Sequence, residues 1–131
     1  MDQIDLFSFQ SPRYHITKPL RLIEMFGGVG CQAKALKNLG VEFEHYRYYE
    51  IDPRPVDSYN AIFGTNFKPQ DICQVHGPDL GIDDDRYCYI ITYSFPCQDL
   101  SLAGKQKGMA KGSSTRSGLL WEVERILDEC V

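Results

Sequence analysis

The sequence lacks any long uninterrupted hydrophobic run. Of its 131 residues, 43% are apolar, but no stretch approaches the roughly 18 consecutive apolar residues that a membrane-spanning helix needs. The start, MDQIDLFSFQ, has neither the basic region nor the apolar centre of a secretory signal. These absences argue against a membrane-spanning helix and predict a cytoplasmic or nucleoid-associated chain.

Cysteine pairs at metal-ligand spacing are also absent. The five cysteines form no Cys-x-x-Cys pair. An odd, unpaired set argues against a disulfide framework and against a zinc site. We therefore expect no metal, and free thiols in a reducing compartment.

An overall excess of basic residues is absent as well. The chain has 14 Lys and Arg against 18 Asp and Glu, a net charge of −4, so it has no general attraction to nucleic acid. Between Leu100 and Trp121, however, all charged residues are basic: Lys105, Lys107, Lys111 and Arg116. This glycine-containing segment is either a contact to a phosphate backbone or a solvated surface loop.

What the sequence does contain is an alternation of strands and helices. Residues 20–26 form a short, mostly apolar run followed by Gly27 and Gly28, which is typical of a buried strand before a sharp turn. A helix is expected from about residue 31, with Gly40 at the position of a left-handed C-terminal cap. Its expected buried stripe is Cys31, Ala35, Leu36 and Leu39.

The same order then repeats. Residues 41–50 are rich in Phe and Tyr and predict a second strand, after which Asp52 and Pro53 indicate a helix start. The helix should end at Gly64. Its expected buried face is Val56, Tyr59 and Phe63.

The second half supplies the strongest strand. Residues 66–85 predict a short edge strand and a surface loop, and residues 87–93 (YCYIITY) a strand that breaks at Ser94. The last helix should cover 118–131. Its expected apolar face is Leu119, Val123, Ile126, Leu127 and Cys130.

This alternation predicts an α/β fold with a doubly wound, mostly parallel sheet, preceded by an extended arm at residues 1–19. Residues 20–131 would form one domain. Ligands of such sheets bind beyond the carboxyl ends of the strands, so residues directly after predicted strands are the candidates for function.

A glycine motif follows the first predicted strand. Residues 26–33 (FGGVGCQA) have a Gly-x-Gly-x-x-Ala pattern, and Glu50 lies 20 residues after Gly30 at the end of the next strand. Such glycines let backbone approach a ligand closely, and the carboxylate can accept both hydrogen bonds of a ribose diol. The pattern predicts a nucleoside site; the alternative is a tight turn beside a solvated carboxylate.

A cysteine follows the last predicted strand. Cys97, in Phe95-Pro96-Cys97-Gln98, is the one cysteine in a loop after a strand end, where its pKa can be lowered and the thiolate can act as a nucleophile. The other cysteines, Cys31, Cys73, Cys88 and Cys130, are expected to be small core residues.

Five sequence blocks together carry a family resemblance. From about Leu20 to the C-terminus, the chain resembles the N-terminal motifs of the DNA cytosine-5 methyltransferases, in the family's order. The blocks are FGGVG (26–30), Tyr49-Glu50-Ile51-Asp52, Asp71-Ile72, FPCQ (95–98) with SLAGKQKG (101–108), and TRSGLLWEVERIL (115–127).

The resemblance implies the N-terminal half of a Rossmann-like sheet that binds S-adenosylmethionine. Glu50 would bind the ribose hydroxyls, Ile51 would contact the adenine face, and Asp71 with Ile72 would meet the adenine edge. The implied cofactor contacts are Phe26, Gly28, Gly30, Glu50, Ile51, Asp71, Ile72 and Leu119.

The resemblance also implies the reaction and the substrate. The Cys97 thiolate would add to carbon 6 of a cytosine flipped out of double-stranded DNA, which makes carbon 5 nucleophilic toward the donor's methyl group. Loss of the carbon 5 proton and elimination of the thiolate would then restore the ring. The implied substrate contacts are Pro96, Gln98, Ser101, Lys105, Gln106 and Arg116.

Some family features differ or are missing. Glu24 and Gly27 stand where the family usually has Asp and Ala, and Cys31 where a further Gly is common. The Glu-Asn-Val block, the Gln-x-Arg-x-Arg block and the target recognition region are absent. We therefore expect a truncated or split portion that is inactive alone, with an uncovered edge on the 87–93 strand.

Four further possibilities remain open from the sequence. A second polypeptide could complete the enzyme, or the chain could self-associate through the exposed sheet edge. The substrate could be tRNA, because a tRNA-modifying branch shares the fold and the Pro-Cys nucleophile. The chain could also be a non-catalytic remnant that binds a nucleoside or a partner.

Overall fold

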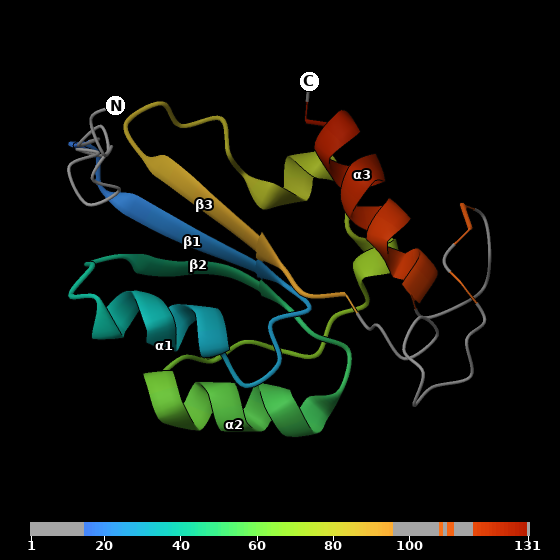
Figure 1. Ribbon diagram of the computed structural model, residues 1–131, viewed down its shortest axis with the longest axis horizontal. Coiled ribbons are helices and arrows are strands. Elements are labelled where there is room, and N and C mark those ends of the chain that lie inside the picture. The colour runs from blue at the N-terminus through green and yellow to red at the C-terminus, as the bar shows by residue number, and fades with distance from the viewer. Residues whose placement is uncertain (1–14, 96–107, 109, 112–116, 131) are drawn as a thin grey trace, which may run out of the picture.

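Three parallel strands form a single sheet; the sequence predicts these three and also a fourth, short edge strand. The computed structural model describes residues 15–95, 108, 110–111 and 117–130. Within these residues the strands are β1 (Leu20–Met25), β2 (Glu44–Tyr49) and β3 (Cys88–Tyr93), in the order β2-β1-β3. All three arrows point the same way in Figure 1, so the carboxyl ends of the strands share one end of the sheet.

Helix α1 (Cys31–Asn38) ends as predicted. Gly40 adopts a left-handed conformation (φ 73°), and its N–H donates to the Lys37 carbonyl at 3.0 Å. The N–H of Val41 donates to the Leu36 carbonyl at 3.1 Å. These two bonds form a Schellman cap, which only a residue tolerant of positive φ permits at low cost.

The predicted buried stripe of α1 is wrong. Cys31 and Ala35 are exposed and Leu39 is 78% exposed, whereas Ala33 is the buried residue and Leu36 is half-buried. The helix has only eight residues, little more than two turns. Its orientation is therefore set by the glycine turn before it and not by its longest apolar stripe.

Helix α2 (Pro53–Phe63) begins and ends at the predicted residues. The Asp52 side chain caps it by accepting a hydrogen bond from the Arg54 N–H at 3.0 Å, and Gly64 closes it in a left-handed conformation (φ 67°). The predicted face is confirmed for Val56 and Tyr59, which are buried, and Phe63 is partly buried.

Residues 66–85 contain no strand, contrary to the prediction. The chain instead forms two short 3₁₀ turns, η1 (Ile72–Gln74) and η2 (Gly77–Leu80). Ile72, Val75 and Leu80 are buried from this stretch. Their irregular spacing fits separate turns and not the alternation of a strand.

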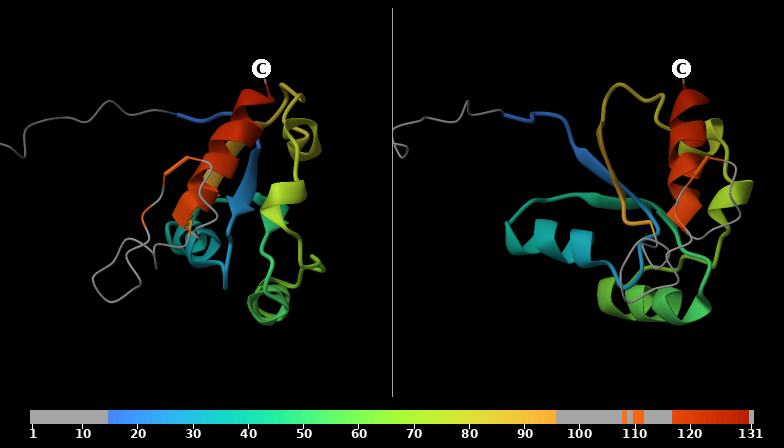
Figure 2. Two further views of the ribbon diagram at one scale, coloured as in Figure 1. Left: turned by 90° about the vertical axis from the view of Figure 1, so that its right-hand side faces the viewer. Right: turned by 45° about the vertical axis from the view of Figure 1, so that its right-hand side comes forward.

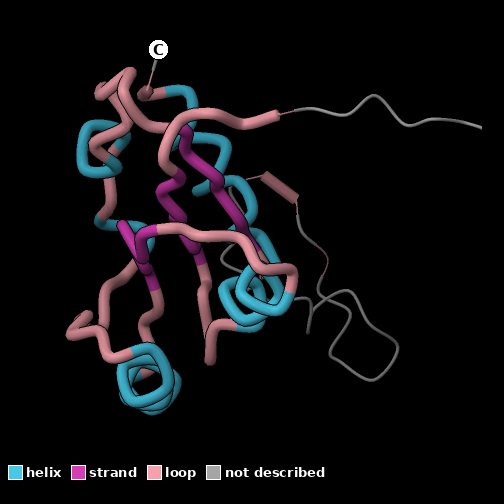
Figure 3. The backbone as a smooth tube through the Cα atoms, turned by 90° about the vertical axis from the view of Figure 1, so that its left-hand side faces the viewer, coloured by secondary structure: helices cyan, strands magenta, loops and turns pink. Residues whose placement is uncertain are grey.

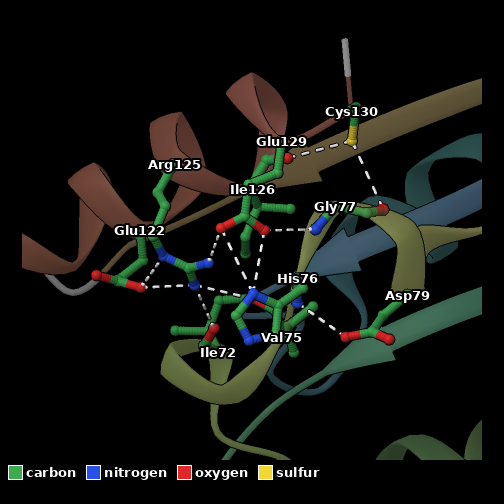
Figure 4. Close-up of polar contacts among 10 residues, drawn as sticks. All are labelled: Ile72, Val75, His76, Gly77, Asp79, Glu122, Arg125, Ile126, Glu129 and Cys130. Carbon is green, nitrogen blue, oxygen red and sulfur yellow. Dashed lines mark hydrogen bonds and ion pairs between the residues drawn. The ribbon is translucent and has the colours of Figure 1, made fainter.

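Helix α3 (Leu120–Asp128) follows the single turn η3 (Ser117–Leu119) and packs on η1 and η2. Figure 4 shows the Arg125 guanidinium between Glu122 and Glu129, with donation to the Val75 carbonyl at 2.8 Å. Of the predicted apolar face, Val123 and Ile126 are buried, Leu119 and Cys130 are half-buried, and Leu127 is 37% exposed.

Two apolar clusters cover the two faces of the sheet. Leu22 and Tyr48 pack against α1 and α2, while Ile23, Met25 and Tyr49 pack against η1, η2 and α3. Figure 1 shows α1 and α2 below the sheet and α3 beside the two turns at its right, an arrangement that can be followed from other sides in Figures 2 and 3. Three layers of this kind confirm the α/β fold class.

Strand β3 forms one edge of the sheet, and no described strand pairs with its outer side. None of its residues is buried although its sequence is strongly apolar, and Tyr93 is 49% exposed. This is the unpaired apolar edge expected from the resemblance.

Two of the cysteines expected in the core lie at the surface. Cys31 and Cys73 are exposed, and Cys88 and Cys130 are half-buried. Cys31 is the first residue of α1 and Cys73 the second residue of the short turn η1, so the usual preference of cysteine for the core does not decide their position. No helix in the described parts of the chain is long and apolar enough to cross a membrane.

Candidate functional site

A pocket lies at the carboxyl ends of the strands, where the fold class predicts ligands to bind. Its volume is about 170 Å³, below the roughly 300–1,000 Å³ of sites that enclose a drug-sized ligand, so it encloses only part of such a ligand. The lining residues are Phe26, Tyr49, Glu50, Ile51, Gln70, Asp71, Ile72, Ser94 and Leu119. Six of the eight predicted cofactor contacts are among them: Phe26, Glu50, Ile51, Asp71, Ile72 and Leu119.

Phe26 turns the chain out of β1 into the pocket wall. It is the one described non-glycine residue with positive φ, at 55°, a conformation that costs an ordinary residue roughly 1–3 kcal/mol. The next residue, Gly27, donates its N–H to the Tyr49 carbonyl at 3.1 Å. Strain of this kind persists where the surrounding structure fixes it, which is common at ligand sites.

The Glu50 carboxylate is held by two backbone N–H groups. Oε2 accepts from the Gly28 N–H at 3.2 Å and Oε1 from the Asp52 N–H at 3.1 Å. Because a carboxylate offers about four acceptor positions, these two bonds leave capacity for a ligand's hydroxyl groups. Glu50 is thus a fixed, half-buried acceptor at the pocket.

The two motif glycines, Gly28 and Gly30, have different roles. Gly28 is left-handed (φ 53°), and a Cβ on it would meet nothing within 4 Å, so its backbone is open to approach beside Glu50. At Gly30 (φ 87°) a Cβ would lie 2.4 Å from the Phe63 ring and 2.8 Å from the Tyr59 ring. Gly30 lies outside the pocket and permits close packing of α2 under the turn.

Another part of the pocket wall comes from the start of η1. The Asp71 side chain caps this turn by accepting from the Cys73 N–H at 2.9 Å. The Gln70 N–H donates to the Glu50 carbonyl at 2.8 Å, which ties this wall to the end of β2. Leu119, at the start of α3, also lines the pocket.

Sequence reasoning missed three lining residues, Tyr49, Gln70 and Ser94. Tyr49 directly precedes Glu50 and Gln70 directly precedes Asp71, while Ser94 lies two residues before Pro96, so proximity to the motifs was the available signal. Burial raises the pKa of Tyr49 to about 12, so its phenol stays neutral. Ser94 is fixed by the Gln32 side chain, whose amide donates to Oγ at 2.7 Å.

A buried carboxyl group, that of Glu24, contacts both α1 and α2. Glu24 is 1% exposed and accepts hydrogen bonds from the Ala33 N–H at 3.3 Å and from the Tyr59 hydroxyl. Burial raises the pKa of Glu24 above its usual range. The sequence marked Glu24 only as a departure from the family's Asp; here the side chain satisfies the first turn of α1 and contacts α2.

Comparison with known proteins agrees with this geometry. The family model of C-5 cytosine-specific DNA methylases matches residues 20–130. The chain belongs to that family. The match includes all three strands of the sheet and every segment that lines the pocket.

Individual relatives within this methylase family match different lengths of the chain. Type II methyltransferase M.HhaI of Haemophilus parahaemolyticus is 34% identical over 111 residues, which cover 84% of this chain and 30% of the length of M.HhaI. Orphan methyltransferase M.SssI of Spiroplasma monobiae is 74% identical over 39 residues, which cover 30% of this chain and 10% of the length of M.SssI.

A solved structure supports the fold of this family member. Dnmt2 methyltransferase of S. pombe superposes with a TM-score of 0.60 at 22% identity, covering 83% of this chain and 29% of that one. The chain thus spans less than a third of the length of each of these three methyltransferases.

The predicted nucleophile and substrate contacts lie outside the described residues. These are Cys97 and Pro96, Gln98, Ser101, Lys105, Gln106 and Arg116. They therefore stay predictions from the sequence. Ser94, three residues before Cys97, is the described residue nearest to it along the chain that lines the pocket.

Proposed function

We propose that this chain is the cofactor-binding and nucleophile-bearing part of a DNA cytosine-5 methyltransferase, with S-adenosylmethionine as the methyl donor. The pocket is the observation that carries the proposal, because six of the eight implied cofactor contacts line it together. They come from four separate segments, after β1, after β2, at η1 and before α3. Only the fold brings these segments to one place.

The chemistry of the pocket suits an adenosine group. Glu50 has acceptor capacity for the ribose hydroxyls, Ile51 offers an apolar face for the adenine ring, and Asp71 offers polar groups at its edge. The volume of about 170 Å³ suits part of the cofactor, with the remainder extending toward the open backbone of Gly28. Gly30 would act through the shape of the turn. When bound, S-adenosylmethionine supplies an electrophilic methyl group.

Cys97 would provide the nucleophile. It follows Ser94 by three residues, and three residues of chain span at most roughly 11 Å, which keeps the thiol within reach of the pocket. Its thiolate would bond to carbon 6 of cytosine and make carbon 5 nucleophilic toward the methyl group. Departure of the carbon 5 proton and of the thiolate would then regenerate the aromatic ring and the enzyme.

The basic segment after Cys97 would contact the substrate. Lys105 and Arg116 carry positive charge toward DNA phosphates, and Ser101 and Gln106 offer hydrogen bonds. Pro96 and Gln98 flank the nucleophile. A flipped cytosine is required because carbon 6 is not accessible inside a duplex, and flipping costs about a few kcal/mol.

Further protein would be needed for activity. The outer edge of β3 is unpaired in the described residues, and the chain spans 30% of M.HhaI. We propose that the remaining catalytic and recognition regions cover this edge, and that the chain is inactive without them.

Calorimetric titration with S-adenosylmethionine tests the cofactor site. We expect saturable binding, weakened about tenfold or more by Glu50→Gln, because the amide replaces one of the two accepting oxygens with a donor NH2 group and hydrogen bonds to a charged group contribute about 1.5–3 kcal/mol. Glu44→Gln is the matched control, since Glu44 is an exposed β2 residue paired with Arg21. No binding by the unmodified chain, or equal weakening by both variants, would contradict the proposal.

Co-expression with a polypeptide carrying the missing Glu-Asn-Val and recognition regions tests the reaction. We expect transfer of labelled methyl groups to cytosine in DNA and complete loss of transfer in Cys97→Ser. Cys31→Ser, at an exposed position on α1, is the control and should keep activity. Transfer by Cys97→Ser would refute the nucleophile, and transfer to tRNA in place of DNA would refute the substrate.

A further inference from the structure

Strand β2 contains an irregularity that decides which of its tyrosines meets the glycine turn. Leu22 of β1 pairs with His45, but the next residue, Ile23, pairs with Arg47, so Tyr46 is an extra residue in β2. An extra residue of this kind exchanges the two faces of the strand beyond it. Accordingly, Tyr46 packs with the cluster on the α3 face, whereas Tyr48, two residues later, packs with the cluster on the α1 and α2 face.

The exchange places the Tyr48 ring directly under the turn after β1. Tyr48 is 2% exposed, and a Cβ on Gly27 would lie 2.4 Å from its ring. The alanine that the family usually has at position 27 therefore could not coexist with this ring position. Gly27 and Tyr48 form a matched pair.

The Tyr48 hydroxyl joins the turn to the pocket carboxylate. It donates to the Gly28 carbonyl at 2.6 Å, while the Gly28 N–H donates to Glu50 at 3.2 Å. Hydrogen bonds on both sides of the Gly28 Cα fix this left-handed residue (φ 53°), which has no side chain of its own to hold it. Burial and the nearby carboxylates of Glu50 and Glu24 raise the pKa of Tyr48, so the hydroxyl keeps the proton that it donates.

We propose that Tyr48 is a positioning residue for the ribose site: its hydroxyl, brought to this face by the extra residue in β2, holds Gly28 so that Glu50 presents its free acceptor positions to a ribose diol. This inference rests on the proposed adenosine site. It differs from that proposal in assigning the orientation of Glu50 to a residue that does not line the pocket.

Selectivity for the diol separates positioning from simple stability. We expect NMR titration of the chain to show tighter binding of adenosine than of 3′-deoxyadenosine by roughly tenfold, the value of one hydrogen bond to a charged group. Tyr48→Phe keeps the ring and removes the hydroxyl, and should reduce the preference to about twofold. A merely structural loss would weaken both ligands equally and leave the preference unchanged, which would overturn the inference.

A matched control lies on the same strand. The Tyr46 hydroxyl also donates to a glycine carbonyl, that of Gly81 at 2.9 Å, but on the face away from α1 and α2. Tyr46→Phe should leave the diol preference at the unmodified value. If neither adenosine nor S-adenosylmethionine binds the unmodified chain, the proposed adenosine site fails, and the role of Tyr48 is then decided without ligand.

Amide hydrogen exchange provides that measurement. The N–H groups of Gly28 and Asp52 both donate to Glu50, so loosening of this carboxylate must increase their exchange rates. We expect Tyr48→Phe to speed exchange at both amides about tenfold relative to Tyr46→Phe. Equal rates at these two amides in the two variants would refute the positioning role whatever the ligand results.

Discussion

At the scale of single residues, two of the three departures from the family pattern, Glu24 and Gly27, are explained by partners within the chain. Glu24 is longer than the usual Asp, and its second oxygen accepts from the Tyr59 hydroxyl on α2. Gly27 is smaller than the usual Ala and makes space for the Tyr48 ring. Each of these two departures is compensated by a tyrosine, so neither indicates a decayed site.

The pairing of Gly27 with Tyr48 predicts a coupled pair of substitutions. Gly27→Ala should lower the free energy of unfolding by about 1–3 kcal/mol, because the new methyl group overpacks a buried ring. In a Tyr48→Ala background the same substitution should cost almost nothing, a coupling of about 0.5–3 kcal/mol. Urea unfolding of the four proteins measures the cycle, and additive effects would contradict the contact.

His45 predicts a pH dependence of stability. Burial, followed by the charge of Lys37, lowers the pKa of His45 below its usual 6.5. Its Nδ1 lies 2.6 Å from the Tyr59 hydroxyl, and its Nε2 is buried with no hydrogen-bond partner in the described structure. Because the unfolded chain takes up this proton more readily, stability should fall as pH decreases through 6.5 toward the folded-state pKa.

The measurement is the urea midpoint at pH 7.5 and pH 5.5. His45→Phe keeps the aromatic packing with Phe43 and Phe63 and should lose less stability over this interval than the unmodified protein. Glu24 contributes with the opposite sign, since its raised pKa lowers stability as pH rises above 4.5. An equal loss in both proteins would exclude His45 as the source.

At the scale of elements, the ends of α1 and α2 were predictable, whereas α3 covers Leu120–Asp128 and not the predicted 118–131. The buried faces of the helices were less predictable than the ends of α1 and α2. Asp52, Gly40 and Gly64 act through local backbone chemistry, which the sequence states directly. The face of α1 depends on the turn that aims it, and the turns η1 and η2 bury single residues without a period. Spacing rules therefore failed where long-range contacts decide the outcome.

Arg125 is predicted to hold α3 against the pocket wall. Its guanidinium donates to the Val75 carbonyl at 2.8 Å and lies between Glu122 and Glu129, as Figure 4 shows. Arg125→Met should lower the free energy of unfolding by about 1–3 kcal/mol, since a half-buried carbonyl and two carboxylates lose a charged partner. Thermal or urea unfolding measures the change.

Arg86→Met is the control for this prediction. Arg86 pairs with Asp84 at 2.6 Å, but its side chain is 78% exposed, and such surface pairs contribute about 0–1 kcal/mol. An Arg125→Met effect no larger than that of Arg86→Met would mean that apolar packing alone holds α3.

At the scale of the whole molecule, the site was more predictable than the packing around it. Phe26, Glu50, Ile51 and Asp71 follow strands or precede turns, and a parallel sheet brings such positions to one end. Tyr48 could not be predicted to support them, because only the pairing of β1 with β2 reveals the extra residue that turns its side chain. Local motifs thus predict the residues that line the pocket, whereas the residues that position them depend on strand register.

The unpaired edge of β3 leads to a last prediction, which concerns how a complementary polypeptide would bind the chain. The N–H groups of Cys88 and Ser94 donate to the carbonyls of Pro19 and Met25, so they point toward β1. Since backbone groups alternate along a strand, the amides of Tyr89, Ile91 and Tyr93 point to the unpaired side. In the isolated chain these three amides should exchange quickly with solvent, while those of Ile90 and Thr92 should be protected by β1.

Adding the complementary methyltransferase polypeptide should slow exchange at Tyr89, Ile91 and Tyr93 by about a hundredfold or more, because a new strand would satisfy these amides. Ile90 and Thr92, already paired, should change little and serve as internal controls. Slow exchange at all five amides in the isolated chain, dependent on its concentration, would instead mean that a second copy occupies the edge. Restored methylation without any protection at this edge would place the completing surface elsewhere on the molecule.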